Sequence, residues 1–106
     1  MKMITAIVNR KDAGEVCRAL TEAGYYLTKL SSTGGFLTSG NTTLLLGTEE
    51  ERVDGVLSLI RRHCSRRVES TAGMSLGTAA SMSYPTEVVV GGAVIFVTAV
   101  EQFEKV

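Results

Sequence analysis

The fold is decided by residues 3–24, MITAIVNRKDAGEVCRALTEAG, which read first as a strand and then as a helix. Residues 3–9 are apolar and rich in β-branched side chains, as in a strand buried on at least one face. We expect Asp12 and Glu15 to cap the start of the helix and Gly24 to end it. The apolar residues that follow the strand recur at spacings of three and four, which indicates one helix face: Ala13, Val16, Leu20 and Ala23.

A second run of strands and a helix follows in residues 25–64. Residues 25–32 and 42–47 are predicted to be strands because both are short and apolar or β-branched. Thr48 and Glu51 have the spacing of a capping box, so we expect the second helix to begin there. Its apolar stripe is predicted to consist of Val53, Val56, Leu57, Ile60 and Cys64.

The last third of the chain is less regular. Residues 65–85 are dominated by Ser, Thr, Ala, Gly and Met without any period, so they are predicted to form a long, mobile loop. Residues 87–90 and 93–100 are predicted to be strand segments. The glycines between them fit either a tight hairpin or a bulge within one bent strand.

The resulting order is βαββαβ, which predicts a single α+β domain over residues 1–106 with a ferredoxin-like sandwich fold. Such a sheet carries its helices on one face. Because the predicted strands are rich in Val, Ile and Leu on both faces, we expect the other face to meet another subunit. Three-fold closure is one symmetric way to cover it, so a homotrimer is predicted.

Composition and charge exclude several classes of protein. The chain has 106 residues, 44% of them hydrophobic, with 11 basic and 11 acidic side chains, so no basic surface points to nucleic acid. Its apolar stretches are too short for a membrane span, and its N-terminus does not resemble a signal peptide, so we expect a cytoplasmic protein. One histidine and two separated cysteines favour neither a metal site nor a catalytic triad. We therefore expect no enzyme activity and no cofactor.

The densest unusual segment is Thr33-Gly34-Gly35-Phe36-Leu37 followed by Gly40-Asn41-Thr42-Thr43. Glycines let backbone amides approach a ligand, Asn41 offers a donor and an acceptor, and Phe36 offers a stacking face. The same residues would also suit an ordinary connection between strands, in which Gly and Asn adopt a positive φ. The residues alone leave both interpretations open.

Two further groups are weaker candidates. Thr28 and Lys29 could contact a phosphate or a purine edge, although threonine also occurs in strands through propensity alone. Gly91, Gly92 and Phe96 could approach a ligand, but bending a strand and filling the core are the simpler roles. The sequence by itself favours these structural roles.

The motifs of the whole chain resemble those of the PII-like cyclic di-AMP receptor proteins. The resemblance rests on Thr28-Lys29-Leu30 through Gly40-Asn41-Thr42-Thr43 in the first half. In the second half it rests on Arg52-Val53-Asp54, Val90-Gly91-Gly92-Ala93 and Val100-Glu101-Gln102-Phe103. It implies a trimer with a PII-like ferredoxin fold that binds cyclic di-AMP between subunits and relays the signal through flexible loops to a partner protein, without catalysis.

The resemblance also implies which residues contact the ligand. Thr28 and Asn41 would hydrogen-bond its edges, and Gly47 would permit close approach. The remaining ligand-binding residues it implies are Gly35, Phe36, Leu37, Gly91, Gly92 and Phe96. Two further ligand-binding residues are predicted from their own chemistry: the Lys29 ammonium could contact a phosphate, and the Tyr26 ring could stack on a base.

Two alternatives remain. Family members carry asparagine, arginine and a basic residue where this chain has Gly24, Tyr26 and Thr38. These replacements favour either a divergent trimer for another adenine nucleotide or a ligand-free module whose residues 65–85 dock a protein. An enzyme or a metal-handling trimer has little support.

Overall fold

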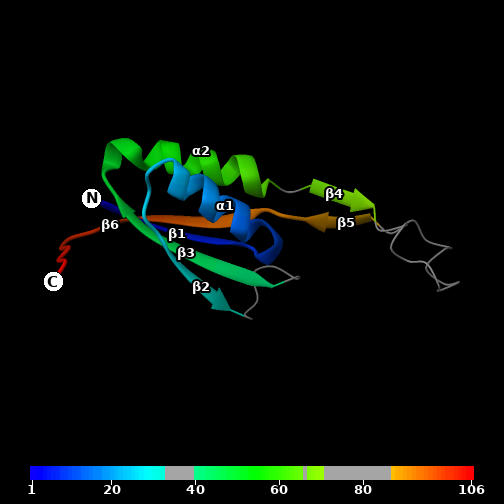
Figure 1. The fold of residues 1–106 in the computed structure, drawn as a ribbon, viewed down its shortest axis with the longest axis horizontal. Coiled ribbons are helices and arrows are strands. Elements are labelled where there is room, and N and C mark those ends of the chain that lie inside the picture. The colour runs from blue at the N-terminus through cyan, green and yellow to red at the C-terminus, as the bar shows by residue number, and fades with distance from the viewer. Residues whose placement is uncertain (33–39, 66, 71–86) are drawn as a thin grey trace, which may run out of the picture.

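The computed structural model describes residues 1–32, 40–65, 67–70 and 87–106 (Figure 1). Its helices and strands alternate along the chain in the order expected of a βαββαβ protein, with one additional strand pair before the last strand. The elements are β1 (Lys2–Asn9), α1 (Arg10–Glu22), β2 (Thr28–Ser32), β3 (Asn41–Thr48), the 3-10 turn η1 (Glu50–Arg52), α2 (Val53–Cys64), β4 (Arg67–Ser70), β5 (Glu87–Val90) and β6 (Ala93–Ala99).

Four of the strands form one antiparallel sheet in the order β2-β3-β1-β6. Both helices lie on the same side of this sheet, and no other described helix or strand covers its second side (Figure 1). The α+β architecture predicted from the sequence is therefore confirmed, and the strand order is compatible with a ferredoxin-like fold.

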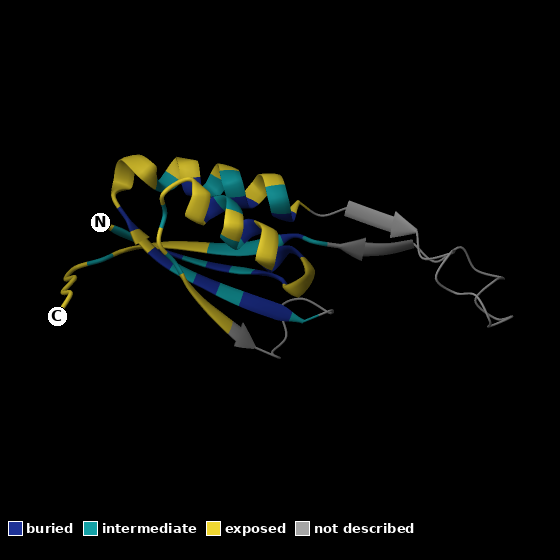
Figure 2. Cartoon of the chain, in the orientation of Figure 1, coloured by how far each residue is buried: buried dark blue, intermediate teal, exposed yellow. Residues whose placement is uncertain are grey.

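The hydrophobic core lies between the helices and the sheet, and Figure 2 shows the buried residues along these facing surfaces. Alternate residues of β1 and β3 are buried, as the two-residue repeat of a strand requires. Leu59, rather than the predicted Leu57, is among the residues that pack against this core, and Ala23 is exposed at the end of α1. The predicted helix stripes are therefore corrected at Ala23 and Leu57. The buried apolar side chains are Ile4, Ala6, Val8, Ala13, Val16, Leu20, Leu44, Leu46, Val56, Ile60 and Cys64.

The start of α1 differs from the prediction. Asn9, the last residue of β1, is the N-cap, and its side-chain oxygen accepts a hydrogen bond from the Lys11 amide at 2.8 Å. The strand thus passes into the helix without a linker, and Asp12 is a buried residue within the first turn. The prediction that Asp12 caps the helix was wrong because pairing within the sheet fixes where the strand ends.

The end of α1 agrees with the prediction at Gly24. This residue has φ +90°, a conformation that side chains other than glycine's rarely adopt. The Gly24 amide donates to the Thr21 carbonyl at 3.0 Å, and the Tyr25 amide donates to the Leu20 carbonyl at 2.9 Å. These two bonds form a Schellman motif, which satisfies carbonyls that the helix end would otherwise leave open.

The start of α2 was predicted four residues too early. The capping box proposed for Thr48 and Glu51 is absent, because Thr48 is the last residue of β3 and Glu51 lies within η1. The Arg52 amide donates to the Glu49 carbonyl at 3.0 Å. Helix α2 begins after this turn, with no side-chain cap at Arg52. The Arg52 guanidinium instead lies 4.3 Å from the centre of the Tyr25 ring, a cation–π contact between the β3–α2 connection and the α1–β2 connection.

Residues 65–85 contain a strand that the sequence did not indicate. Strand β4 pairs with β5 as a separate two-stranded ribbon, which continues beyond the main sheet (Figure 1). Because β5 pairs with β4 and β6 pairs with β1, residues 87–99 bend rather than form a hairpin. The bend is at Gly91 and Gly92, with φ of +81° and +89°. Residues 66 and 71–86 lie outside the described residues, so the mobility expected there stays a prediction.

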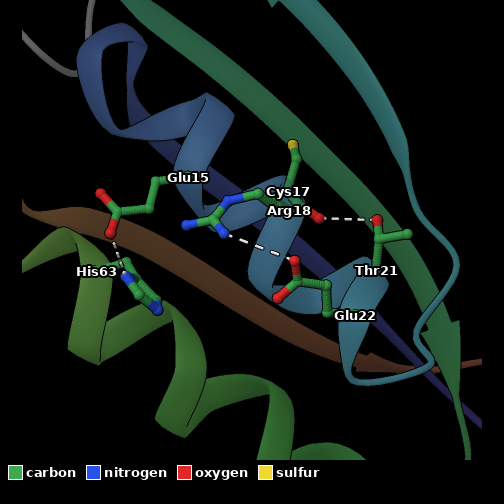
Figure 3. A network of polar contacts seen from close by, with 6 residues as sticks. All are labelled: Glu15, Cys17, Arg18, Thr21, Glu22 and His63. Carbon is green, nitrogen blue, oxygen red and sulfur yellow. Dashed lines mark hydrogen bonds and ion pairs between the residues drawn. The ribbon is translucent and has the colours of Figure 1, made fainter.

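Polar contacts connect the helices on their outer side (Figure 3). His63 Nδ1 of α2 lies 3.2 Å from Glu15 Oε1 of α1. Within α1, Arg18 and Glu22 form an exposed ion pair at 3.6 Å, one helical turn apart. Such exposed pairs contribute little, typically below about 1 kcal/mol, so apolar burial is what holds the helices on the sheet.

Candidate functional site

The side of the sheet away from the helices has no charged residue on its described strands, and the residues from the row of Met3 to the row of Ile7 are apolar or threonine. We call it the open face and define it by strand register, since directly paired residues lie on the same side of a sheet. Several of its large side chains are well exposed, among them Met3 (38%), Leu30 (46%) and Phe96 (48%). From the row of Met3 to the row of Ile7, the open face consists of Met3, Thr5, Ile7, Thr28, Leu30, Thr43, Leu45, Gly47, Val94, Phe96 and Thr98; the next row on this side, Asn9 with Asn41, is buried and forms its boundary.

Three residues predicted to contact a ligand lie on this face. Thr28 pairs with Leu45, Leu45 with Thr5, and Thr5 with Phe96, so one row crosses all four strands. Three strand spacings separate the ends of this row, about 14 Å between Thr28 and Phe96. Gly47 belongs to the neighbouring row, where it pairs with Met3, and a Cβ atom built on it would lie 3.7 Å from Met1 Sδ.

A second group of predicted residues lies at one end of the sheet. Asn41 begins β3 opposite Asn9, the last residue of β1. Gly92 directly precedes Ala93, the first residue of β6, which pairs with Val8. Gly91 and Gly92 therefore belong to the same end of the sheet as Asn9 and Asn41. Asn41 and Gly92 are both buried, and the Gly92 amide donates a hydrogen bond to the Cys64 carbonyl. This end therefore joins β1, β3, β6 and the last turn of α2.

The segment predicted to be the densest part of the site connects to the same end. Gly35, Phe36 and Leu37 lie outside the described residues, but the residues that flank the segment can be placed. Ser32 is the last residue of β2 and pairs with Asn41. The sequence prediction for this loop therefore remains untested, whereas its two attachment points lie beside Asn41.

Tyr26 and Lys29 lie apart from both groups. Tyr26 precedes β2 and is 90% exposed, so its ring makes little contact with the residues that the structure describes. Lys29 pairs with the buried Leu44, which places it on the helix-covered side of the sheet near Cys17. Burial raises the pKa of the Cys17 thiol above its usual range, and the Lys29 ammonium offsets part of that rise.

A pocket of about 290 Å³ adjoins the end of the sheet, between α2 and the start of β6. Its lining is mainly apolar, with the exposed Arg61 at its edge, and it includes one predicted residue, Gly92. Its volume is at the lower limit of small-molecule sites, which typically span about 300–1,000 Å³. The pocket does not by itself enclose the predicted ligand-binding residues.

Arg10 adds a positive charge that the sequence did not indicate. Its amide donates to the Gly40 carbonyl at 3.3 Å, which fixes the first residue of α1 beside the start of β3. Its guanidinium lies over Gly40, on the same end of the sheet as Asn41. No signal in the sequence could have revealed this placement, because residues 10 and 40 become neighbours only through the pairing of β1 with β3.

The site contains hydroxyls, amides, glycines and one aromatic ring rather than reactive groups. Among the residues that the structure describes, no three His, Cys, Asp or Glu side chains cluster closely enough to hold a metal ion. In that same part of the chain, no helix is both long and apolar enough to cross a bilayer. The groups present can hydrogen-bond and stack against a ligand.

Comparison with known proteins agrees with this chemistry. A crystal structure of a functionally unknown protein from Pediococcus pentosaceus ATCC 25745 is 43% identical to this chain and superposes with a TM-score of 0.78. The match covers 99% of this chain and 96% of the other. The sequence pattern that defines the cyclic-di-AMP receptors matches residues 1–106, and the chain therefore belongs to the cyclic-di-AMP receptor family.

Proposed function

We propose that the protein is a non-catalytic signalling receptor that binds cyclic di-AMP in clefts between the subunits of a homotrimer. Membership of the cyclic-di-AMP receptor family is the observation that supports this ligand. The side chains gathered in the two groups suit the ligand, since hydroxyl and amide groups can read adenine edges and an aromatic ring can stack on a base. In this proposal a partner protein receives the signal.

The geometry of a single subunit supports a site that two copies complete. Thr28 and Phe96 lie on the open face, whereas Asn41, Gly91 and Gly92 lie at the end of the sheet. The pocket beside Gly92 is too small to accommodate a dinucleotide comfortably. When a neighbour covers the open face, its sheet end supplies the second wall, and closed three-fold symmetry would repeat this cleft three times.

The apolar character of the open face supports the assembly itself. It has no charged residue, and Leu30 and Phe96 each expose nearly half of their surface. A contiguous apolar surface of this kind on a protein usually marks an interface. The neighbour that fits best is a second copy, since the Thr and aliphatic residues of the face complement each other without unpaired charge.

Titration calorimetry of the purified protein with cyclic di-AMP tests the proposal, with cyclic di-GMP and ATP as competing ligands. We expect selective binding of one cyclic di-AMP per subunit and a trimeric mass by light scattering. Thr28→Ala and Asn41→Ala should each weaken binding, whereas Ser58→Ala, which removes an exposed hydroxyl from α2, should not. Because Asn41 is buried, the melting temperature of its variant must be measured alongside.

Each outcome separates the alternatives. Undiminished affinity in both Thr28→Ala and Asn41→Ala would refute the site. Preferential binding of ATP would support the alternative of a trimer for another adenine nucleotide. Absence of binding to all three nucleotides would refute the receptor function and leave a protein-interaction module as the better description.

A further inference from the structure

Arg10 is held at the end of the sheet by two contacts with one glycine. Its amide donates to the Gly40 carbonyl at 3.3 Å. A Cβ atom built on Gly40 would collide with a terminal nitrogen of the guanidinium and would lie 3.0 Å from both Cζ and Nε. The arginine side chain thus occupies the space that any side chain at residue 40 would need.

The backbone of Gly40 adds a second reason for glycine at this position. Its φ is +97°, in the region that L side chains rarely adopt. Gly40 is also the last residue before Asn41, at the return of the segment that begins after Ser32. The guanidinium therefore lies over Gly40, the residue before Asn41, in space that is free because residue 40 has no side chain.

The charge of Arg10 is not used within the described part of the chain. Its side chain is exposed, and no described carboxylate lies within ion-pair distance of it. A cyclic dinucleotide carries two phosphodiester charges. Of the ligand-binding residues predicted from the sequence, Lys29 alone is cationic, and the register places Lys29 on the helix-covered side of the sheet.

We propose that Arg10 binds a phosphodiester group of the ligand at the end of the sheet, and that Gly40, which lies against the guanidinium, orients it. This inference rests on the proposed function, because it takes the ligand to be a cyclic dinucleotide. A guanidinium offers several N–H donors in one plane and forms paired hydrogen bonds to phosphate oxygens. Arg10 therefore supplies the charge that the neutral hydroxyls, amides and glycines of the site lack.

The test compares cyclic di-AMP binding by the wild-type protein, Arg10→Ala, Arg10→Lys and Lys11→Ala at two salt concentrations. Arg10→Ala should raise the Kd roughly ten- to hundred-fold and reduce its dependence on salt. Arg10→Lys should restore part of the affinity, because it keeps the charge but loses the planar geometry. Lys11→Ala is the matched control: it removes an exposed cation from the next residue, and its Kd should stay within about threefold of the wild type.

Gly40→Ala provides an independent variant, since it should displace the guanidinium while keeping the charge, and should also weaken binding. Wild-type affinity in Arg10→Ala, with a wild-type melting temperature, would overturn the inference while leaving the receptor function intact. Equal losses in Arg10→Ala and Lys11→Ala would overturn it as well, because general electrostatic attraction would then explain both. Absence of binding by the wild-type protein would refute the proposed function and this inference with it.

Discussion

Replacing Phe96 by serine should separate the subunits of the proposed trimer. Phe96 is on β6 at the end of the row that crosses the open face, and 48% of its surface is exposed in a single chain. In an assembly closed through this face, that surface would be buried against a neighbour. Serine keeps the strand backbone but removes the ring.

The magnitude follows from the exposed area. A phenylalanine buries roughly 200 Å² when fully enclosed, so the exposed half corresponds to about 100 Å². At about 25 cal/mol per Å² of apolar surface, the loss is about 2.5 kcal/mol for each subunit, or about 7 kcal/mol for a complete trimer. A change of this size would shift a trimer that persists at micromolar concentration to one that dissociates under the same conditions.

Val97→Ser is the matched control. Val97 follows Phe96 on the same strand and is similarly exposed, at 42%, but it pairs with Ile4 on the helix-covered side. Sedimentation velocity over a range of concentrations should show dissociation of Phe96→Ser and an unchanged mass for Val97→Ser. Circular dichroism must show that both variants remain folded. Equal masses for Phe96→Ser and the wild type at every concentration would refute the role of the open face in assembly.

Two smaller changes test the local structure. Gly24→Ala should lower the free energy of unfolding by about 1–2 kcal/mol, because φ is +90° at this residue. Gly14→Ala should raise it by about 0.5–1 kcal/mol, because Gly14 is in the exposed middle of α1 with open space around it. Urea unfolding in which both variants change the free energy in the same direction would contradict the positive φ of Gly24. Because burial raises the pKa of Cys17, less of its thiol is ionised at a given pH, and it should react with iodoacetamide more slowly than a free thiol. Lys29→Gln should slow the alkylation of Cys17 further, because the Lys29 ammonium lowers the pKa of this thiol. Faster alkylation of Cys17 in Lys29→Gln, measured by peptide mass spectrometry, would exclude this interaction between Lys29 and Cys17.

The elements that the sequence predicted well are those whose signal is local. The apolar spacing in α1 and α2 identified most of the buried helix residues, because a helix face depends only on residues three and four apart. Gly24 was predicted correctly for a similar reason, since the residue type itself reports a positive φ. Short-range patterns of this kind do not depend on how the rest of the chain folds.

The predictions that failed depended on pairing between distant segments. Asn9 and Asp12 are both good capping residues, and the pairing of Asn9 with Asn41 decided which of them begins α1. Strand β4 has only four residues and no apolar alternation, and its partner β5 lies 17 residues further along the chain. The apolar, β-branched β5 was predicted as a strand, whereas a segment as short and polar as β4 carries no periodic signal of its own.

The candidate site shows the same division. The sequence could propose Thr28 and Phe96 separately, but only the register places them in one row across four strands. It could not propose Arg10, whose position depends on the pairing of residue 9 with residue 41. The resemblance to a known family supplied candidates for the ligand contacts, and the fold determined which of them can act together within one subunit.

A site shared between copies links ligand binding to assembly, and this linkage can be measured. Leu30 lies on the open face, is 46% exposed and is not among the ligand-binding residues predicted from the sequence. Leu30→Ser should therefore weaken the trimer by about 1 kcal/mol per subunit, roughly half of what full burial of a leucine contributes. A ligand that binds only the assembled form adds about 2.7 kcal/mol per site at a concentration of one hundred times its Kd.

The free energy that the bound ligand adds to the trimer exceeds the free energy that Leu30→Ser removes from it. Saturating cyclic di-AMP should therefore restore the trimeric mass of Leu30→Ser at protein concentrations where the variant without ligand dissociates. Cyclic di-GMP at the same concentration should not restore it. A ligand that bound within one subunit would have equal affinity for the monomer and the trimer, and it would leave the mass of the variant unchanged however tightly it bound. Sedimentation of Leu30→Ser with and without cyclic di-AMP thus distinguishes a site between subunits from a site within one, independently of any change to the residues that contact the ligand.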